Sequence, residues 1–348
     1  MSAPARWLIT GGCGFIGTNL IERLLADGKQ VRVFDNLTVG SRDSLGAISK
    51  FAEVTDGAEW SSGVQLMVGD IREAAEVREA ARGAEVIVHL AASTGVPQSV
   101  EDPMHDCTSN VIGVLNTLEA ARQESVKRFI FASSGAPAGE VEPPIHEEVV
   151  PKPVSPYGAS KLAGEAYCSA YSRTFGVECV ALRFGNVYGP KSGHKTSVVA
   201  KWINRAMEGL QLEIYGDGTA TRDFIFVGDL VDAVVKAGVA SAESVAGEIF
   251  QIATSRETTV GEVAETIRTA LKRFGIDVPE VVYEAVRLGD VHRNYSDTSK
   301  ARSQLGWTAM TGLAEGIGIT VESSLARIDG ETPSRDQAAM HDARRRQG

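Results

Sequence analysis

The sequence predicts a doubly wound α/β fold, in which helices cover both faces of a parallel sheet and a smaller C-terminal α/β lobe is attached. In the first half of the chain, short apolar runs rich in β-branched and aromatic residues alternate with amphipathic helical stretches. This alternation is typical of a parallel sheet with crossover helices. The 348 residues, 43% of them hydrophobic, are enough to bury a sizeable core.

The expected elements of the sheet follow one another at short intervals. Strands are expected at 6–10, 30–34, 64–68, 85–90, 128–132 and 177–183. Helices are expected at 14–26, 110–124 and 156–175. The connection 42–63 is unusually long, and we expect a short helix near 43–51 within it.

After residue 186 the alternation of strands and helices becomes irregular. The expected order is a loop at 190–195, a helix near 198–208, a turn at 215–218, a strand at 224–227, a helix to about 240, a strand at 248–253 and a helix at 259–274. This arrangement indicates a lobe that is interleaved with the last elements of the sheet.

Composition and charge exclude several classes of partner. With 35 Lys and Arg against 45 Asp and Glu, a net charge of -10 leaves no large basic surface for nucleic acid or an anionic membrane. No apolar run reaches the ~18–20 residues that span a bilayer. The four cysteines lack metal-like spacing, and the first residues enter a strand pattern without a secretory signal. We therefore expect no metal site, no membrane segment and a cytoplasmic location.

The sequence TGGCGFIG at 10–17 is a glycine-rich turn between an expected strand and an expected helix. In this position Gly11, Gly14 and Gly17 allow a tight turn, and the N-terminal end of the helix presents N–H groups to a pyrophosphate. The second strand leads into Asp35, where a carboxylate binds a ribose 2′-hydroxyl and repels a 2′-phosphate. Together these features predict a Rossmann-type dinucleotide site that prefers NAD to NADP.

Tyr157 and Lys161 are four positions apart on an expected helix, so that they share one face. A free tyrosine has a pKa of about 10 and is a poor base at neutral pH, but an adjacent ammonium group favours the phenolate. Ser134 follows an upstream strand, at the edge of the sheet where sites of this fold lie. We expect Ser134, Tyr157 and Lys161 to form a proton-transfer group. His89 lies in an apolar strand and is interpreted as a core histidine.

The sequence resembles the extended short-chain dehydrogenase/reductase family, and within it the nucleotide-sugar epimerases and dehydratases. The resemblance covers about residues 6–307 and rests on motifs that occur in order: TGGCGFIG, DNLTVGSR, GDI, HLAAS, FASS, SPYGASKLAGE, RFGNVYGP, RDFIFVGDL and RLGDVHRNYSDTSKARSQLGW. We expect residues 1–185 and about 224–255 to form the NAD-binding domain. About 186–223 and 256–328 are expected to form the nucleotide-sugar-binding lobe, and 329–348 a disordered polar tail.

The resemblance implies a set of NAD-binding residues. Asp35 and Asn36 would hold the adenosine ribose, Asp70 and Ile71 would border the adenine, and 90–92 would line the path to the nicotinamide. The full implied set is Gly11, Gly14, Phe15, Ile16, Gly17, Asp35, Asn36, Ser41, Asp70, Ile71, Leu90, Ala91, Ala92, Asn110, Tyr157 and Lys161.

The resemblance also implies residues that bind the nucleotide sugar. These are Ser134, Asn186, Ser197, Val198, Tyr215, Arg222, Arg287 and Asp290. Tyr215 would pack on the base, and the two arginines would hold the diphosphate, because a guanidinium offers fixed donors to phosphate oxygens. A UDP-linked sugar is the expected partner.

In the family's dehydratases an acidic pair follows the hydroxyl residue, whereas Gly135 and Ala136 follow Ser134 here. Without a positioned acid, loss of water from the sugar is poorly catalysed. We therefore expect a 4-epimerase acting on UDP-glucose, UDP-glucuronate or UDP-N-acetylglucosamine, in which Tyr157 deprotonates the C4 hydroxyl and NAD takes and returns the C4 hydride. The alternatives are a dehydratase, decarboxylase or sugar reductase of the same family, and a non-catalytic NAD-binding module.

Some local features bear on the sugar and on assembly. Ala138 stands where the family more usually has an aromatic residue, which puts the shape of the sugar pocket in doubt. The side chains of Lys191, His194 and Lys195 face either a sugar carboxylate or solvent, and the solvated interpretation is favoured. The long, Ala-rich helices at 110–124 and 156–175 resemble those that pair in family dimers, so we expect a homodimer.

Overall fold

The structure of the protein is a computed structural model that describes residues 4–193, 197–278, 280–285 and 292–330. Its centre is an eight-stranded sheet in which every neighbouring pair of strands is parallel. The strands are β1 (Arg6–Thr10), β2 (Gln30–Asp35), β3 (Phe51–Glu53), β4 (Val64–Val68), β5 (Val86–His89), β6 (Arg128–Ser134), β7 (Glu178–Phe184) and β12 (Glu248–Ile252). The predicted doubly wound α/β fold is confirmed.

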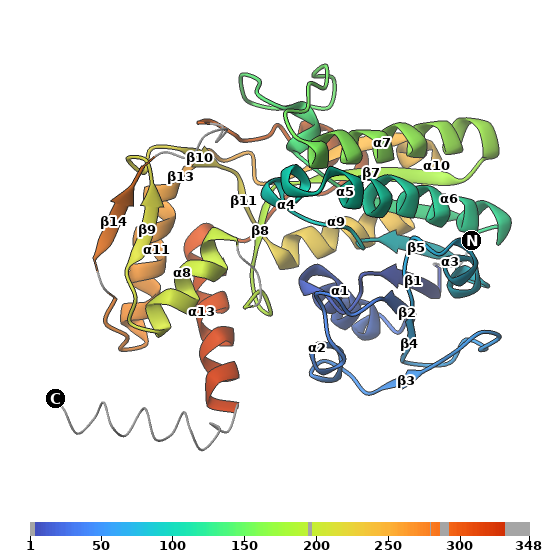
Figure 1. Cartoon of the computed structure of the whole chain (residues 1–348), viewed down its shortest axis with the longest axis horizontal. Coiled ribbons are helices and arrows are strands. Elements are labelled where there is room, and N and C mark those ends of the chain that lie inside the picture. The colour runs from blue at the N-terminus through green and yellow to red at the C-terminus, as the bar shows by residue number, and fades with distance from the viewer. Residues whose placement is uncertain (1–3, 194–196, 279, 286–291, 331–348) are drawn as a thin grey trace.

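Helices cover both faces of the sheet, as Figure 1 shows. One face packs against α1 (Phe15–Ala26), α9 (Val227–Val239), α10 (Ala242–Val245) and α12 (Ser299–Leu305). The other face packs against α3 (Ala74–Ala81), α6 (Gly113–Gln123) and α7 (Pro156–Phe175). Because successive strand residues point to opposite faces, neighbours such as Leu8 and Ile9 belong to different apolar cores.

The chain starts in the middle of the sheet and winds outward in two directions. The strand order is β12-β7-β6-β5-β1-β2-β4-β3, so the direction of winding reverses between β1 and β5. The carboxyl ends of the strands diverge at this switch point and leave a crevice there, where ligands of open α/β sheets bind. The topology therefore places Thr10, Asp35 and Ser134, each the last residue of its strand, at one edge of the sheet.

Short helices complete this domain. They are α2 (Arg42–Gly46), α4 (Val96–Glu101), α5 (Pro103–Cys107), a π-helical turn η1 (Thr108–Ile112) and a 3-10 turn η2 (Ala136–Ala138). The helix expected near 43–51 is shorter than predicted, because α2 ends at Gly46 and Phe51 begins the edge strand β3. Ile48 and Phe51 pack against the sheet core, and this tertiary contact favours the extended backbone of β3.

The C-terminal lobe has a third apolar core, formed by residues such as Trp202, Ile214 and Ile267. Its elements are β8 (Asn186–Tyr188), α8 (Val198–Met207), β9 (Leu212–Tyr215), β10 (Thr221–Arg222), β11 (Phe224–Phe226), β13 (Thr258–Thr259), α11 (Val260–Arg273), β14 (Val281–Glu284) and α13 (Leu313–Gly330). Its strands pair as β8 with β11, β9 with β14 and β10 with β13. Figure 1 shows the lobe beside one end of the sheet domain.

Three segments differ in place from the expected division of the chain. Strand β11, expected in the NAD-binding domain, pairs with β8 and contributes Phe224 to the core of the lobe. Ala301, Leu305 and Trp307, expected in the lobe, pack in the core of the sheet domain. Helix α13 continues to Gly330, so the first two residues of the expected tail are helical, and 331–348 lie outside the described residues. Among the helices in the described part of the chain, none is both long and apolar enough to cross a membrane.

Gly164 permits close contact between α7 and β6. A Cβ atom at this position would lie 2.4 Å from the ring of Phe131. We predict that Gly164→Ala destabilises the protein by about 1–3 kcal/mol, because overpacking forces α7 away from the sheet. The control is Gly318→Ala in α13, where a Cβ meets nothing within 4 Å.

The control variant should gain about 0.5–1 kcal/mol, since alanine restricts the unfolded chain. Urea denaturation of both variants measures the two effects. Equal stability of Gly164→Ala and the parent protein would contradict the close packing of α7.

Candidate active site

The glycine-rich turn joins β1 to α1 at the switch point of the sheet. Gly11 has a φ of +68°, and a Cβ atom there would lie 2.8 Å from the backbone nitrogen of Ala91, so this position requires glycine. Helix α1 begins at Phe15, and its N-cap Gly14 makes no side-chain capping bond. The N–H groups of the first turn can therefore bind a phosphate.

Asp35 ends β2 beside this turn. Its Oδ2 accepts a hydrogen bond from the backbone N–H of Cys13 at 2.9 Å, and its Oδ1 accepts one from Leu37 at 2.8 Å. Burial raises the pKa of Asp35, and the two backbone donors lower it. The carboxylate is thus fixed against the turn, in the position from which an acid binds a ribose hydroxyl. Of the other predicted NAD residues, Ile16 and Gly17 lie in α1, and Ser41 caps α2.

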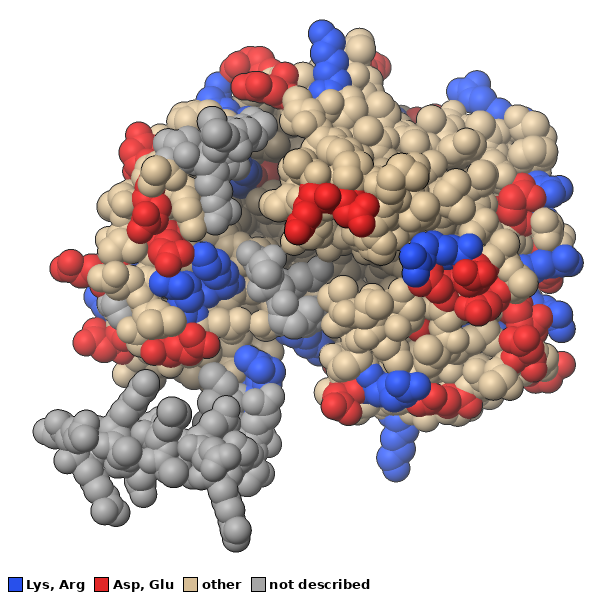
Figure 2. Space-filling view, in the orientation of Figure 1, with Lys and Arg blue, Asp and Glu red and all other residues tan. Residues whose placement is uncertain are grey.

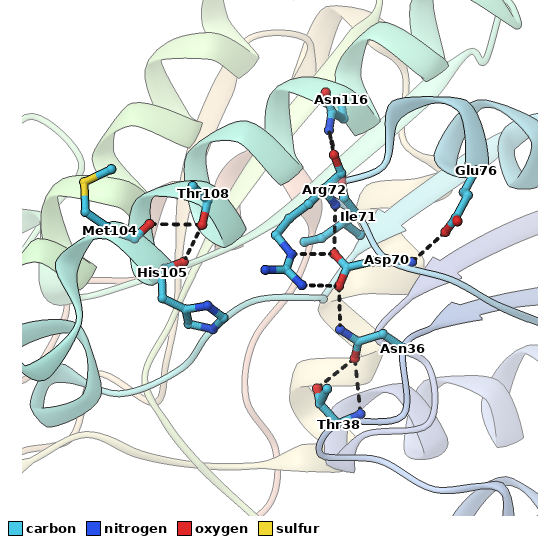
Figure 3. A network of polar contacts seen from close by, with 10 residues as sticks. All are labelled: Asn36, Thr38, Asp70, Ile71, Arg72, Glu76, Met104, His105, Thr108 and Asn116. Atoms are coloured by element: carbon cyan, nitrogen blue, oxygen red, sulfur yellow. Dashed lines mark hydrogen bonds and ion pairs between the residues drawn. The ribbon is translucent and has the colours of Figure 1, made fainter.

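Asn36, predicted to hold the adenosine ribose, and Asp70, predicted to border the adenine, are in direct contact (Figure 3). The Nδ2 of Asn36 donates to Asp70 Oδ2 at 3.1 Å, and Arg72 donates to both oxygens of Asp70 at 2.8 and 3.0 Å. The Arg72 hydrogen bonds hold the pKa of Asp70 well below its usual range. Asn116 Nδ2 donates to the carbonyl oxygen of Ile71 at 3.0 Å, which fixes the neighbouring residue as well.

The loop 90–92 follows β5 and lies against the end of β1. Its first two N–H groups donate to the carbonyl and hydroxyl oxygens of Thr10, at 3.1 and 3.3 Å. The next residue, Ser93, exchanges two hydrogen bonds of 2.8 Å with the side-chain amide of Asn110 in η1. The structure therefore joins Asn110 to the loop that was predicted to line the path to the nicotinamide.

Ser134, Tyr157 and Lys161 lie together at the carboxyl end of β6. Helix α7 begins just before Tyr157, because Ser155 accepts a capping bond from Gly158 and Pro156 occupies the first turn. The Lys161 Nζ lies 5.7 Å from the centre of the Tyr157 ring and donates to the carbonyl oxygen of Ala132 at 2.9 Å. The predicted proton-transfer group is thus assembled by the first two turns of one helix and the end of one strand.

Burial dominates the ionisation of both helix residues. It raises the pKa of Tyr157 to about 12, against the lowering effect of a hydrogen bond with Ser134. It lowers the pKa of Lys161 to about 8, against the raising effect of the carboxylates of Asp106 and Glu165. At neutral pH Lys161 therefore carries a positive charge beside a neutral Tyr157.

Buried polar residues that the sequence reasoning did not single out support this group. Glu165 accepts from Ser133 Oγ at 2.6 Å and forms a two-point ion pair with Arg183 at 2.8 Å. Asp106 in α5 accepts from Ser160 of α7 and from Asn110. In the sequence, Glu165 continues the four-residue spacing of Tyr157 and Lys161 and ends the motif SPYGASKLAGE.

Three of the predicted sugar-nucleotide residues, Asn186, Ser197 and Val198, lie in the lobe. Asn186 begins β8, two positions after Phe184, which pairs in register with Ser134. Asn186, Ser197 and Val198 line one cavity of about 120 Å³. Figure 2 shows the molecular face hollowed between the lobe and the sheet domain.

Tyr215 and Arg222 are the last residues of β9 and β10, and Lys201 Nζ lies 5.8 Å from the Tyr215 ring centre. The structure therefore brings these two predicted residues to strand ends of the lobe. Arg287 and Asp290 lie outside the described residues.

Other residues named from the sequence have clear surroundings. His89 is buried, its Nδ1 lies 3.0 Å from Thr10 Oγ1, and burial lowers the pKa of its imidazole to about 3, so it is a core histidine as predicted. Lys191 forms an ion pair with Glu22 of α1, whereas His194 and Lys195 lie outside the described residues. Ala138 is fully buried, so it contributes to the interior rather than to an open pocket.

No group of three or more His, Cys, Asp and Glu side chains suited to a metal ion occurs among the residues whose structure is described. The geometry instead fits a dinucleotide, because an uncapped helix N-terminus, a fixed Asp35 and the reactive group at Tyr157 share one edge of the sheet.

Known proteins resemble this chain in sequence and in fold. The model of the NAD dependent epimerase/dehydratase family matches residues 7–253. The UDP-glucose 4-epimerase of Mycolicibacterium smegmatis is 38% identical over 327 residues, which cover 91% of this chain and 97% of that protein. The solved UDP-glucose 4-epimerase of Thermotoga maritima with UDP-glucose has a TM-score of 0.82 at 32% identity, covering 93% of this chain and 99% of that one.

The solved UDP-glucose 4-epimerase of Thermus thermophilus in complex with NAD has a TM-score of 0.79 at 36% identity, covering 91% of this chain and 98% of that one. The family match and these relatives each span well over half of the chain. The chain therefore belongs to the NAD dependent epimerase/dehydratase family and is an NAD-dependent enzyme.

Proposed function

We propose that the protein inverts C4 of a UDP-hexose through a 4-keto sugar, with Tyr157 as the base. UDP-glucose, UDP-glucuronate and UDP-N-acetylglucosamine are the candidate substrates. The observation that carries the proposal is the grouping of Tyr157, Lys161 and Ser134 at the carboxyl end of β6. Similarity to UDP-glucose 4-epimerases over nearly the whole chain supports it.

The cofactor would lie across the carboxyl ends of β1, β2 and β5. The first turn of α1 would bind its pyrophosphate, Asp35 its adenosine ribose, and the loop 90–92 its nicotinamide half. Bound NAD supplies reversible transfer of the C4 hydride.

Tyr157 would take the proton from the C4 hydroxyl and later return it. A tyrosine with a high pKa performs this task only when its phenolate is stabilised. Lys161 supplies a positive charge 5.7 Å from the ring centre, and Ser134 contributes a hydroxyl to the same hydrogen-bonded group. Lys161 is itself held by the carbonyl oxygen of Ala132, so its charge stays beside the ring.

The nucleotide half of the substrate would stay in the lobe while the keto sugar turns. Asn186, Ser197 and Val198 would contact it along their shared cavity, with Tyr215 on the base and Arg222 on the diphosphate. We also assign Arg287 and Asp290 to this half of the site on the motif that contains them. Anchoring only the nucleotide allows either face of the sugar to meet the same hydride carrier.

A dehydratase or decarboxylase is the second candidate, since the family includes both epimerases and dehydratases. Gly135 and Ala136, which follow Ser134, carry no acid, and a general acid is needed to expel water. The alternative of a non-catalytic NAD-binding module is disfavoured because Ser134, Tyr157 and Lys161 are all present.

We further propose that the protein is a cytoplasmic homodimer. Val100, Met104, Ile112 and Tyr167 are exposed on α4, α5, η1 and α7, and Figure 2 shows few charged side chains over α5 and α7. Pairing of this face between two copies would bury apolar area. All four cysteines are free thiols, which fits a reducing compartment.

Incubation with UDP-glucose, UDP-glucuronate and UDP-N-acetylglucosamine separately, without added cofactor, tests the reaction. We expect an isobaric product with inverted C4 from at least one sugar, because the hydride returns to the molecule that lost it. Mass spectrometry and NMR of the products measure this. A product lacking water or carbon dioxide would contradict epimerisation and our reading of Gly135 and Ala136.

Replacement of Tyr157 by Phe tests the base. Since a general base contributes ~10²–10⁴-fold, Tyr157→Phe should lower kcat by at least about 100-fold while NAD affinity is retained. Tyr167→Phe removes a hydroxyl from an exposed position of the same helix and should leave kcat unchanged. Turnover of Tyr157→Phe at the parent rate would exclude Tyr157 as the base.

Sedimentation at micromolar concentration tests the dimer. The parent protein should sediment as a dimer, and Met104→Glu should shift it to a monomer, because a buried charge opposes association. The matched control Met310→Glu changes another exposed methionine, which lies outside the proposed face. A monomeric parent protein, or a dimer that withstands Met104→Glu, would argue against the proposed interface.

A further inference from the structure

Asp106 is a buried carboxylate to which the proposed reaction gives no task. It lies in α5 and is only 1% exposed. Its Oδ1 accepts a hydrogen bond from Asn110 Nδ2 at 2.8 Å, and its Oδ2 accepts one from the hydroxyl of Ser160. A buried carboxylate is costly unless such donors satisfy it. Because both oxygens have a donor, the buried carboxylate is a satisfied part of a hydrogen-bond network.

The two partners of Asp106 lead to the two halves of the site. Ser160 lies in α7 between Tyr157 and Lys161, directly before the lysine. The side-chain amide of Asn110 also forms two hydrogen bonds with the backbone of Ser93. Its oxygen accepts from the Ser93 N–H, and its nitrogen donates to the Ser93 carbonyl oxygen. The carboxylate thus links the helix that carries the base to the loop that follows 90–92.

The local backbone explains how one carboxylate reaches both partners. Asp102 caps α5 by accepting from His105, and the chain then passes through the π-helical turn η1 before α6 begins. Asp106 and Asn110 are four positions apart, across the start of this turn. Such π-helical turns are rare overall, and those that occur are frequently found at functional sites. They redirect side chains without ending the helix.

We propose that Asp106 is a positioning residue that sets the distance between the Tyr157 hydroxyl and the Ser93 loop, and thereby between base and nicotinamide. This inference deepens the proposed function and rests on it. The link is a continuous series of hydrogen bonds, of which the two made by Asp106 are buried, so a shift of either partner would be transmitted to the other. Misplacement of reacting groups by about 1 Å can cost ~10²-fold in rate.

The charge of Asp106 has a separate, measurable consequence. The ionisable groups that face Lys161 are Tyr157 and Glu165 on its own helix, Asp106 from α5 and His89 from β5. Glu165 is paired with Arg183, which offsets its charge, and burial keeps His89 neutral. Among these groups, Asp106 therefore supplies the negative charge that acts on Lys161 without a cation of its own to offset it.

The sign of the effect follows from these contacts. Asp106 raises the pKa of Lys161 and also raises that of Tyr157. Removing its charge lowers both, so the protonated lysine is lost at lower pH and the phenolate forms at lower pH. Both limbs of the pH–rate profile should move to lower pH together. Loss of packing alone would reduce the height of the profile without moving it.

Three variants separate geometry from charge. Asp106→Asn keeps both hydrogen bonds, because the amide oxygen accepts from Asn110 and the amide nitrogen donates to Ser160. Asp106→Ala removes both bonds, and Ser160→Ala removes only the link to α7. Glu101→Gln, at an exposed position of the neighbouring helix α4, is the matched control.

For Asp106→Asn we expect the maximal kcat to stay within about threefold and the whole pH profile to move to lower pH. For Asp106→Ala we expect kcat to fall by at least about tenfold and NAD affinity, measured by calorimetry, to weaken. For Ser160→Ala we expect kcat to fall with NAD affinity unchanged, since the bond between Asn110 and Ser93 remains. Glu101→Gln should match the parent protein in all measurements.

The proposal is overturned if kcat in Ser160→Ala and Asp106→Ala stays within about twofold of the parent, or if Asp106→Asn leaves the pH profile in place. If Asp106→Ala does not fold, the other two variants decide the question. A parent protein that turns over none of the UDP sugars refutes the proposed function instead. In that case the positioning role is still decided by calorimetry, since it requires weaker NAD binding in Asp106→Ala than in Ser160→Ala.

Discussion

The orientation of helix α7 depends on a buried ion pair between Glu165 and Arg183. Their side chains are 1% and 2% exposed, and both carboxylate oxygens are used. Removing one partner of such a pair leaves an uncompensated charge and costs about 3–5 kcal/mol. Tyr157, Lys161 and Glu165 are spaced four residues apart, so they lie on one face of α7. The ion pair holds Glu165 against Arg183 of β7 and thereby fixes the rotation of α7 about its axis. This rotation directs Tyr157 and Lys161 toward the end of the neighbouring strand β6.

A second buried carboxylate joins the sheet domain to the lobe. Asp223 follows Arg222 and accepts from the backbone N–H groups of Thr254, Ser255 and Ser296, at 2.7, 3.0 and 3.3 Å. These donors come from the end of β12 and from the C-terminal segment, so one side chain ties three chain segments together. Arg222, which is proposed to hold the diphosphate, is thereby kept at a fixed place relative to the ends of the sheet strands.

The features that the sequence predicts well are those whose signal is local. The glycine turn, Asp35 and the pair Tyr157 and Lys161 each lie within one strand–turn–helix segment, and the structure has these segments where they were expected. The link between Ser160 and Asp106 joins residues 54 positions apart, which no periodicity indicates. Tertiary contacts likewise determine that residues 51–53 form the short strand β3 and that Trp307 packs in the core of the sheet domain. The local sequence pattern predicts neither feature.

The charges around Tyr157 explain why the proposed base need not be ionised in the unliganded protein. Burial keeps the phenol protonated and raises its pKa to about 12, although a hydrogen bond with Ser134 lowers it. A bound oxidised nicotinamide would bring a positive charge to this site and so lower the pKa of the phenol, whereas a reduced one would be neutral. Tyr157 would then lose its own proton more readily before hydride transfer, when the phenolate is needed, and hold a proton more firmly after it. This order matches the proposed reaction, in which the C4 hydroxyl first gives its proton to Tyr157 and later regains it from the same oxygen atom.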